Sequence, residues 1–228
     1  MQSFLVSKNQ AGQRLDKLLM KYLNKAPKSF LYKMLRKKNI TLNGRKATGS
    51  EIVKLEDEIK LFLSDETINK FTKRIDPIIT NHDFELVYED DNILVINKPV
   101  GLLSQKATKN QISLSEQIIS YLLESKQITQ DHLQTFRPAI CNRLDRNTSG
   151  LIIAGKTLSS LQILSKAFQK QTIEMYYLCI VIGRIKEKQQ ISGYLKKDPR
   201  SNHVVISEEK SLKSSLIKTE YQPISYNG

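Results

Sequence analysis

The sequence predicts an α+β fold in which a small basic region precedes a larger, mainly antiparallel sheet with helices. Strand-like runs occur as hairpin-like pairs mixed with amphipathic helices, without a regular strand–helix–strand order. The charge is also uneven. Of a formal net charge of +13 over 228 residues, residues 1–50 carry +11, from twelve basic side chains and one acid, Asp16. A hydrophobic fraction of 39% is enough for a packed core and argues against a disordered basic tail.

Two short helices are expected at the basic end. Residues 13–24 place leucine and tyrosine side chains at helical spacing, with lysines between them. Pro27 breaks this pattern, and Ser29 is a good N-cap for a second helix over residues 30–38. Each helix has one apolar face, so the two can share a small core.

A hairpin and a further strand are expected next. Residues 40–42 alternate, and Asn43-Gly44 supplies the positive φ of a tight hairpin turn. Residues 54–63 alternate weakly and predict another strand. We therefore assign residues 12–63 to one small domain.

Residues 64–82 have little apolar content and include Pro77, so we expect a linker there. A second domain then occupies residues 83–228. Its strand-like runs, which turn residues separate, lie at residues 86–89, 93–97, 139–143, 151–154, 176–182, 203–207 and 216–223.

Two amphipathic runs of this second domain, residues 113–123 and 158–168, predict helices. Residues 176–182, which Gly183 ends, are apolar throughout and predict a buried strand. The mixture of paired strands and helices favours a mainly antiparallel sheet for this domain.

Several protein classes are disfavoured. No apolar run approaches the ~20 residues that a membrane helix needs, and the first ten residues lack the apolar core of a signal peptide. Cys141 and Cys179 have no short spacing, which fits a reducing compartment, and Cys141 reads as a core side chain. We expect a cytoplasmic protein with no membrane partner, and a monomer is the default. No metal is expected either, because the histidines are scattered, at His82, His132 and His203.

The basic end predicts a polyanionic partner, and nucleic acid is the commonest one. With a single acid among residues 1–50, these cations cannot form a lattice of internal salt bridges. The alternative is an ordinary solvated charged face. Seven side chains that lie off the apolar positions are the expected phosphate contacts: Arg14, Lys17, Lys33, Arg36, Lys37, Arg45 and Lys46.

One loop carries candidate chemistry, at residues 142–150. Asp145 lies between Arg143 and Arg146, and a nearby cation favours an ionised carboxylate. Thr148 and Ser149 can hydrogen-bond the loop backbone, and Gly150 permits a sharp return into the next strand. Such a loop could present a carboxylate for covalent catalysis. On residue chemistry alone, a structural Arg–Asp pair that braces the loop is the favoured interpretation.

A family resemblance favours the catalytic interpretation of Asp145 over the structural one. The nine residues RLDRNTSGL, 143–151, resemble the signature of the RNA pseudouridine synthases of the RluA, large-ribosomal-subunit type. This resemblance implies that Asp145 is the nucleophile and that Arg143 helps to extrude the target uridine. Tyr177, six residues before Gly183, resembles the family tyrosine that packs on the target base. A core aromatic is the alternative for Tyr177.

Further matches occur in the family's order. Asn97 to Gly101 resemble its strand-ending "KPxG" element, and Thr219 to Tyr221 resemble a late strand. The basic N-terminus is similar to an S4 domain, an RNA-binding module often fused to these enzymes. The implied fold is an S4-like domain at 12–63 followed by a pseudouridine synthase catalytic domain at 83–228.

The chain departs from the family pattern at three places. Asn142 replaces the usual His, and Met175 replaces a frequent Lys. The family also continues into a "TGRxHQIR"-like motif with a basic residue thought to pair with the nucleophile. Nothing before Gly228 matches that motif. We therefore expect a C-terminally truncated fragment whose own activity is an open question.

The resemblance implies an isomerase that converts uridine to pseudouridine in ribosomal RNA, with 23S ribosomal RNA as the expected partner and no cofactor. Asp145 would act either at the sugar C1′ or as a base that removes a 2′ proton. One alternative is an RNA-binding module with an inert synthase domain. Another is a different S4-bearing RNA enzyme such as a methyltransferase, which is disfavoured because no glycine-rich cofactor loop follows a strand.

Overall fold

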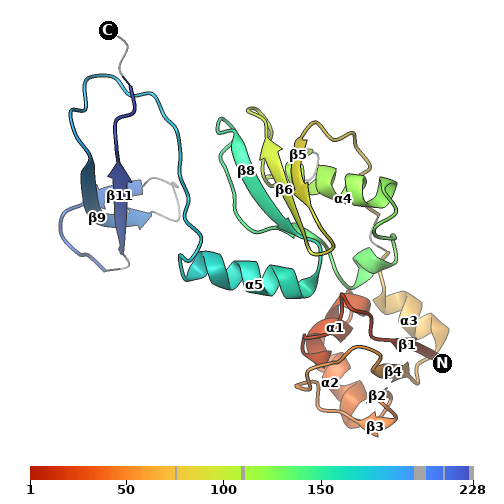
Figure 1. Cartoon of the computed structure of the whole chain (residues 1–228). Helices are drawn as coiled ribbons and strands as arrows, with labels where there is room; N and C mark the ends of the chain where they lie inside the picture. Colours follow the sequence, from red (N-terminus) through yellow and green to blue (C-terminus); the bar gives the residue numbers. More distant parts are fainter. Residues whose placement is uncertain (75, 109–110, 198–203, 213, 226–228) are drawn as a thin grey trace. The chain divides into compact units, whose positions relative to one another are not determined.

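The computed structural model describes residues 1–74, 76–108, 111–197, 204–212 and 214–225. It divides into two compact units, Met1–Glu174 and Met175–Gly228, which are treated separately below. The predicted α+β class is confirmed (Figure 1). No helix in the described ranges has both the length and the hydropathy that crossing a bilayer requires.

The basic end contains two helices and a small antiparallel sheet. The helices are α1 (Leu15–Tyr22) and α2 (Lys28–Arg36), and the sheet has the order β1-β4-β2-β3. Its strands are β1 (Gln2–Leu5), β2 (Ile40–Leu42), β3 (Arg45–Lys46) and β4 (Glu58–Leu61). The hairpin turn is as expected, because Asn43 and Gly44 have φ values of 51° and 71°.

Three details of this region differ from the sequence prediction. Ser29 is not the N-cap: Pro27 occupies that position and α2 begins at Lys28, because a proline at a helix start loses no helical hydrogen bond. The strand expected over residues 54–63 is confined to β4. The strand β1 was not predicted, and it extends the sheet by pairing with β4.

The segment expected to be a linker begins with a helix, α3 (Asp65–Phe71). Ser64 caps it by accepting a hydrogen bond from the Thr67 amide at 3.2 Å. Ile68 is 4% exposed within the N-terminal core, and the Phe71 ring lies 4.4 Å from that of Phe30. The first core therefore extends beyond residue 63.

A second sheet has the antiparallel order β5-β6-β8-β7. Its strands are β5 (Glu85–Glu89), β6 (Ile93–Lys98), β7 (Ala139–Ile140) and β8 (Gly150–Gly155). The helix α4 (Leu114–Glu124), for which Ser113 is the N-cap, packs its apolar side chains on those of β6 and β8 in one core. The short helix η1 (His132–Gln134) precedes β7, and α5 (Leu158–Gln169) follows β8.

The second unit contains a three-stranded antiparallel sheet of order β10-β9-β11. Its strands are β9 (Gln189–Lys197), which was not predicted, β10 (Val204–Ser207) and β11 (Ser215–Tyr221). The first residue of the run expected at 203–207, His203, lies outside the described residues.

The prediction of a buried strand at residues 176–182 is wrong for this structure. The segment is assigned no strand, and its side chains are exposed, with Leu178 at 87% and Ile180 at 99%. An apolar run indicates only that a segment is suited to burial. Burial itself needs a neighbouring strand or helix, and none of the described strands pairs with this segment.

Candidate active site

The loop that carries Asp145 connects β7 to β8 and is fixed at its base by Asn142. The Asn142 side-chain amide donates to the Leu151 carbonyl at 3.1 Å, and its carbonyl oxygen accepts from the Ile153 amide at 2.9 Å. The Cys141 amide donates to the Ile153 carbonyl at 2.7 Å. Asn142 thus continues the pairing of β7 with β8 through its side chain, a structural role at a position where the family usually has His.

The middle of the loop is fixed by Leu144, which is buried. The Ser104 hydroxyl donates to the Leu144 carbonyl and accepts from the Leu144 amide. Gly150, with φ of 128°, makes the sharp return into β8, as predicted. Within the turn the Thr148 backbone amide, not its hydroxyl, donates to the Asp145 carbonyl, at 3.1 Å.

The structure does not pair Asp145 with the arginines beside it. Arg143, Asp145 and Arg146 are all exposed, and among the described residues neither arginine lies within 4.0 Å of the Asp145 carboxylate. Arg146 is used elsewhere: its Nε donates to the Gly101 carbonyl at 3.0 Å, and its own carbonyl accepts from the Gly101 amide at 2.8 Å. The expected Arg–Asp brace is therefore wrong, because Arg146 joins the loop to the segment after β6.

Lys98, the last residue of β6, also makes no ion pair with Asp145 within 4.0 Å in the described part of the chain, but the charge of Asp145 affects its pKa. Its side chain is 0% exposed. Burial lowers the pKa of Lys98, and the charge of Asp145 opposes that shift. From the sequence, the element KPVG was expected only to end a strand, and the electrostatic effect of Asp145 on Lys98 was not predicted. The signal available was a lysine that directly continues an apolar strand.

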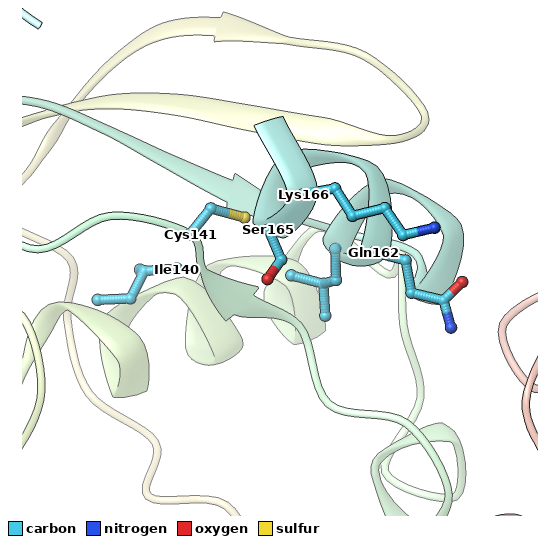
Figure 2. A pocket seen from close by; sticks show the side chains of 6 residues that line it. Ile140, Cys141, Gln162, Ser165 and Lys166 are labelled. Atoms are coloured by element: carbon cyan, nitrogen blue, oxygen red, sulfur yellow. The ribbon is translucent and has the colours of Figure 1, made fainter. Parts of the chain in front are cut away.

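Tyr177 and Cys141 are two further side chains that the sequence singled out. Tyr177 belongs to the second unit and is 61% exposed, so its role as a base-stacking residue stays a prediction. Cys141 is half-buried, and burial raises the pKa of its thiol, which disfavours a nucleophilic thiolate. Figure 2 shows Cys141 in a shallow groove beside α5, with Ile140, Ser165 and Lys166.

The predicted RNA contacts are all exposed. Arg14 differs from the others, because its guanidinium forms two hydrogen bonds to Asp16, at 3.0 and 3.1 Å. For the remaining six, no carboxylate lies within 4.0 Å in the described part of the chain. They are Lys17, Lys33, Arg36, Lys37, Arg45 and Lys46. No three His, Cys, Asp or Glu side chains of the described residues gather as a metal site would require.

Comparison with known proteins agrees with both parts of the chain. A model of the S4 domain matches residues 13–59, and a model of the family described as RNA pseudouridylate synthase matches residues 92–228. An uncharacterized RNA pseudouridine synthase of Mycoplasma genitalium is 30% identical over 234 residues, which cover 98% of this chain and 69% of that protein.

Two further relatives are more distant. Ribosomal large subunit pseudouridine synthase C of Vibrio parahaemolyticus is 24% identical over 82% of this chain and 57% of its own length. The solved structure of human RNA Pseudouridylate Synthase Domain Containing 1 has a TM-score of 0.45 and 16% identity, over 60% of this chain and 51% of that one. This chain thus spans a little over half of each. The family match covers more than half of the present chain, which belongs to the RluA-type RNA pseudouridine synthases, a family of isomerases, and carries an N-terminal S4 domain.

Proposed function

We propose that this protein isomerises uridine to pseudouridine in ribosomal RNA and that Asp145 is its nucleophile or base. The observation that carries this proposal is the loop of residues 143–151. It matches the family signature, and its backbone is fixed at Asn142, Leu144 and Arg146 while the Asp145 side chain is exposed. A fixed backbone with an accessible carboxylate is what attack on a bound nucleotide requires.

The reaction breaks the N1–C1′ bond of uridine, rotates the uracil and forms a bond between C1′ and C5. The C5 proton is lost and N1 regains a proton, so no redox partner is needed. Asp145 would either attack C1′ to give a glycosyl ester or remove the 2′ proton to give a glycal. In both routes the target base first leaves its stack, at a cost of a few kcal/mol. Arg143 could fill the vacated space, and Tyr177 could stack on the uracil.

Ribosomal RNA is proposed as the substrate because Ribosomal large subunit pseudouridine synthase C of Vibrio parahaemolyticus carries that specificity in its name. The exposed cations of the S4 domain suit the phosphates of a structured RNA. We propose 23S ribosomal RNA in particular as the partner.

The test is tritium release from 5-tritiated uridine in 23S RNA, 16S RNA and transfer RNA, with pseudouridine mapping of the products. We expect product with 23S RNA, loss of product in Asp145→Asn, and unchanged RNA binding in that variant. Asp91→Asn, an exposed aspartate in the turn between β5 and β6, is the matched control. Product that persists in Asp145→Asn would refute the assignment of Asp145, and RNA binding without product by the unaltered chain would favour the inert binding module.

A further inference from the structure

Glu116 is a buried carboxylate in the first turn of α4. It is 3% exposed, and its Oε2 accepts a hydrogen bond from the hydroxyl of Ser113, which is fully buried. Its other oxygen, Oε1, forms ion pairs with two cations, Lys106 Nζ at 3.3 Å and Arg137 Nη2 at 3.6 Å. One carboxylate oxygen thus holds together two positive charges from separate segments of the chain.

The charges of this group do not balance. A buried carboxylate needs a partner of opposite charge, but one cation is enough to neutralise it. In the described part of the chain, Glu116 is the only carboxylate within 4.0 Å of Lys106 or Arg137, so two cations share one anion. The two cations also repel each other, which an ion pair with a purely structural role would avoid. The excess positive charge indicates a site for a further anion.

Both cations can be reached from solvent. The side chains of Lys106 and Arg137 are 37% and 46% exposed. Among the described residues, neither the ammonium nor the guanidinium group makes a hydrogen bond in addition to its ion pair. Their N–H groups are therefore available to an acceptor, and phosphate oxygens suit both side chains. Because both cations contact the same oxygen of Glu116, a single phosphate group can bridge them.

The segments that supply the two cations both lead to the loop that carries Asp145. Lys106 lies two residues after Ser104, whose hydroxyl bonds to the backbone of Leu144. Arg137 lies two residues before β7, the strand that enters this loop. The cations therefore belong to the part of the chain that positions the candidate nucleophile.

The start of α4, where Glu116 lies, is joined to the same segment. The Leu114 amide donates to the Leu103 carbonyl at 2.8 Å, and the Ser115 hydroxyl donates to the Ser104 carbonyl at 3.1 Å. These two hydrogen bonds fix the helix start against residues 103–104. Glu116 is thus held in place relative to the segment that supplies Lys106.

We propose that Lys106 and Arg137 form a phosphate-binding site in the synthase domain, held in place by Glu116, and that it binds a backbone phosphate of the RNA strand that carries the target uridine. The identity of this RNA rests on the proposed function. A phosphate contact positions the strand and does not read its sequence. When the uridine leaves its stack, its strand must stay fixed beside Asp145, and a bridged phosphate would fix it. The RNA surface then includes a part outside the S4 domain.

Single variants test this site, because each leaves Glu116 paired with the remaining cation. Lys106→Gln and Arg137→Gln should each lower the slope of log affinity against log salt for 23S RNA by about 0.7–0.9, the effect of one lost phosphate contact. Filter binding with the full chain between 50 and 300 mM salt measures the slope. An unchanged slope in both variants would overturn the proposal.

The matched control is Lys126→Gln, which makes the same change in net charge. Lys126 is exposed and lies beyond the other end of α4, about 15 Å from Glu116 along the helix axis. Its replacement should leave the slope unchanged. If the control lowers the slope as much as Lys106→Gln does, RNA responds only to net charge and the proposed site is refuted.

A second measurement needs no variant and so holds even where a variant fails to fold. Lysines of the full chain are acetylated with an N-hydroxysuccinimide ester, and the modified residues are identified by mass spectrometry. Bound 23S RNA should slow the acetylation of Lys106 several-fold and leave that of Lys126 unchanged. Inorganic phosphate at the same concentration of phosphate groups should not protect Lys106. Equal protection by inorganic phosphate, or no protection by RNA, would overturn the proposal.

Both measurements are independent of turnover. If the unaltered chain binds 23S RNA but gives no product, the proposed function fails, whereas the salt slopes and the acetylation of Lys106 still decide whether the phosphate site exists.

Discussion

The hydroxyl of Ser104 contacts both polar backbone atoms of Leu144, donating to its carbonyl and accepting from its amide at 3.1 Å. Both residues are buried. Because Asp145 follows directly, this single side chain fixes where the chain enters the turn that carries the carboxylate. The contact spans 40 residues of sequence.

Replacing Ser104 with alanine should therefore affect stability and activity together. Ser104→Ala leaves the buried amide and carbonyl of Leu144 without their side-chain partner, which typically costs about 1–3 kcal/mol of unfolding free energy. We also expect a lower rate of pseudouridine formation, since the loop can shift. Urea unfolding and tritium release measure the two effects. Ser159→Ala, an exposed serine on α5, should change the unfolding free energy by less than about 0.5 kcal/mol, and equal losses in both variants would argue against the role of Ser104.

A second prediction concerns Asp16, the one acid among the first 50 residues. Its buried carboxylate accepts two hydrogen bonds from Arg14 and one from the Tyr32 hydroxyl at 2.7 Å. Burial acts to raise the pKa of Asp16, but the hydrogen bonds from Arg14 and Tyr32 outweigh it and lower the pKa below its usual value.

The sign of the pH dependence follows. A carboxyl group whose pKa is lowered by folding contributes stability above its unfolded pKa, about 3.9, and loses it as the pH falls through the folded value. Asp16→Asn should therefore destabilise the protein most near neutral pH, and the difference should shrink as the pH falls below about 3.9. Urea unfolding between pH 2 and 7 measures this. Glu66→Gln, an exposed acid on α3, is the control, and a pH-independent Asp16→Asn difference would contradict the argument.

Local sequence signals were enough for part of the fold. Asn43-Gly44 predicted the hairpin because the required positive φ is a property of the two residues themselves. The amphipathic run at residues 113–123 predicted α4, which spans Leu114–Glu124, because helical periodicity is also a local property of the sequence. The helix α3 was missed because its burial depends on Ile68 and Phe71 meeting the N-terminal core, a tertiary contact with no periodic signal in a seven-residue segment.

The residues of the candidate site also differ in whether local sequence was enough to predict them. Asp145 was identifiable because its motif is contiguous in sequence. Lys98 and Ser104 were not identified, because Ser104 contacts Leu144 across 40 residues of sequence and Lys98 pairs with Gly150, which is even more distant. The arginine brace was wrong for the same reason: proximity to Asp145 in sequence did not reveal that Arg146 bonds to Gly101, 45 residues earlier.

A third prediction concerns the ion pair between Lys156 and Glu89. Lys156 follows β8 and donates to Glu89 at 2.7 Å, while the Tyr121 hydroxyl of α4 donates to the other carboxylate oxygen at 2.6 Å. The Lys156 side chain is only 10% exposed. Lys156→Met should destabilise the protein by about 3 kcal/mol, since it leaves a largely buried carboxylate without its cation.

The double variant Lys156→Met, Glu89→Leu distinguishes the effect of the two charges on stability from the effect of side-chain packing. It should recover part of the loss, because replacing both charges by apolar side chains removes the unpaired carboxylate. Lys170→Met, an exposed lysine just after α5, is the control and should be close to neutral. Urea unfolding measures all three. A double variant less stable than Lys156→Met alone would show that Glu89 matters for reasons other than its charge.

The last prediction locates the RNA surface on α2. Lys33, Arg36 and Lys37 are exposed, and their spacing of three and four residues places them on one helix face. If they contact phosphates, changing all three to glutamine should reduce the slope of log affinity against log salt by about 2, since each lost contact removes about 0.7–0.9. Filter binding to 23S RNA between 50 and 300 mM salt measures the slope.

The control is a second triple variant with the same change in net charge. Lys8, Lys25 and Lys28 are exposed in the same basic N-terminal region but are not among the predicted phosphate contacts. Changing them to glutamine should lower affinity only slightly and leave the slope nearly intact, because long-range attraction falls off within about 10 Å at 0.1 M salt. Equal reductions of the slope in both triple variants would mean that RNA responds to the net charge of the S4 domain, without specific phosphate contacts by α2.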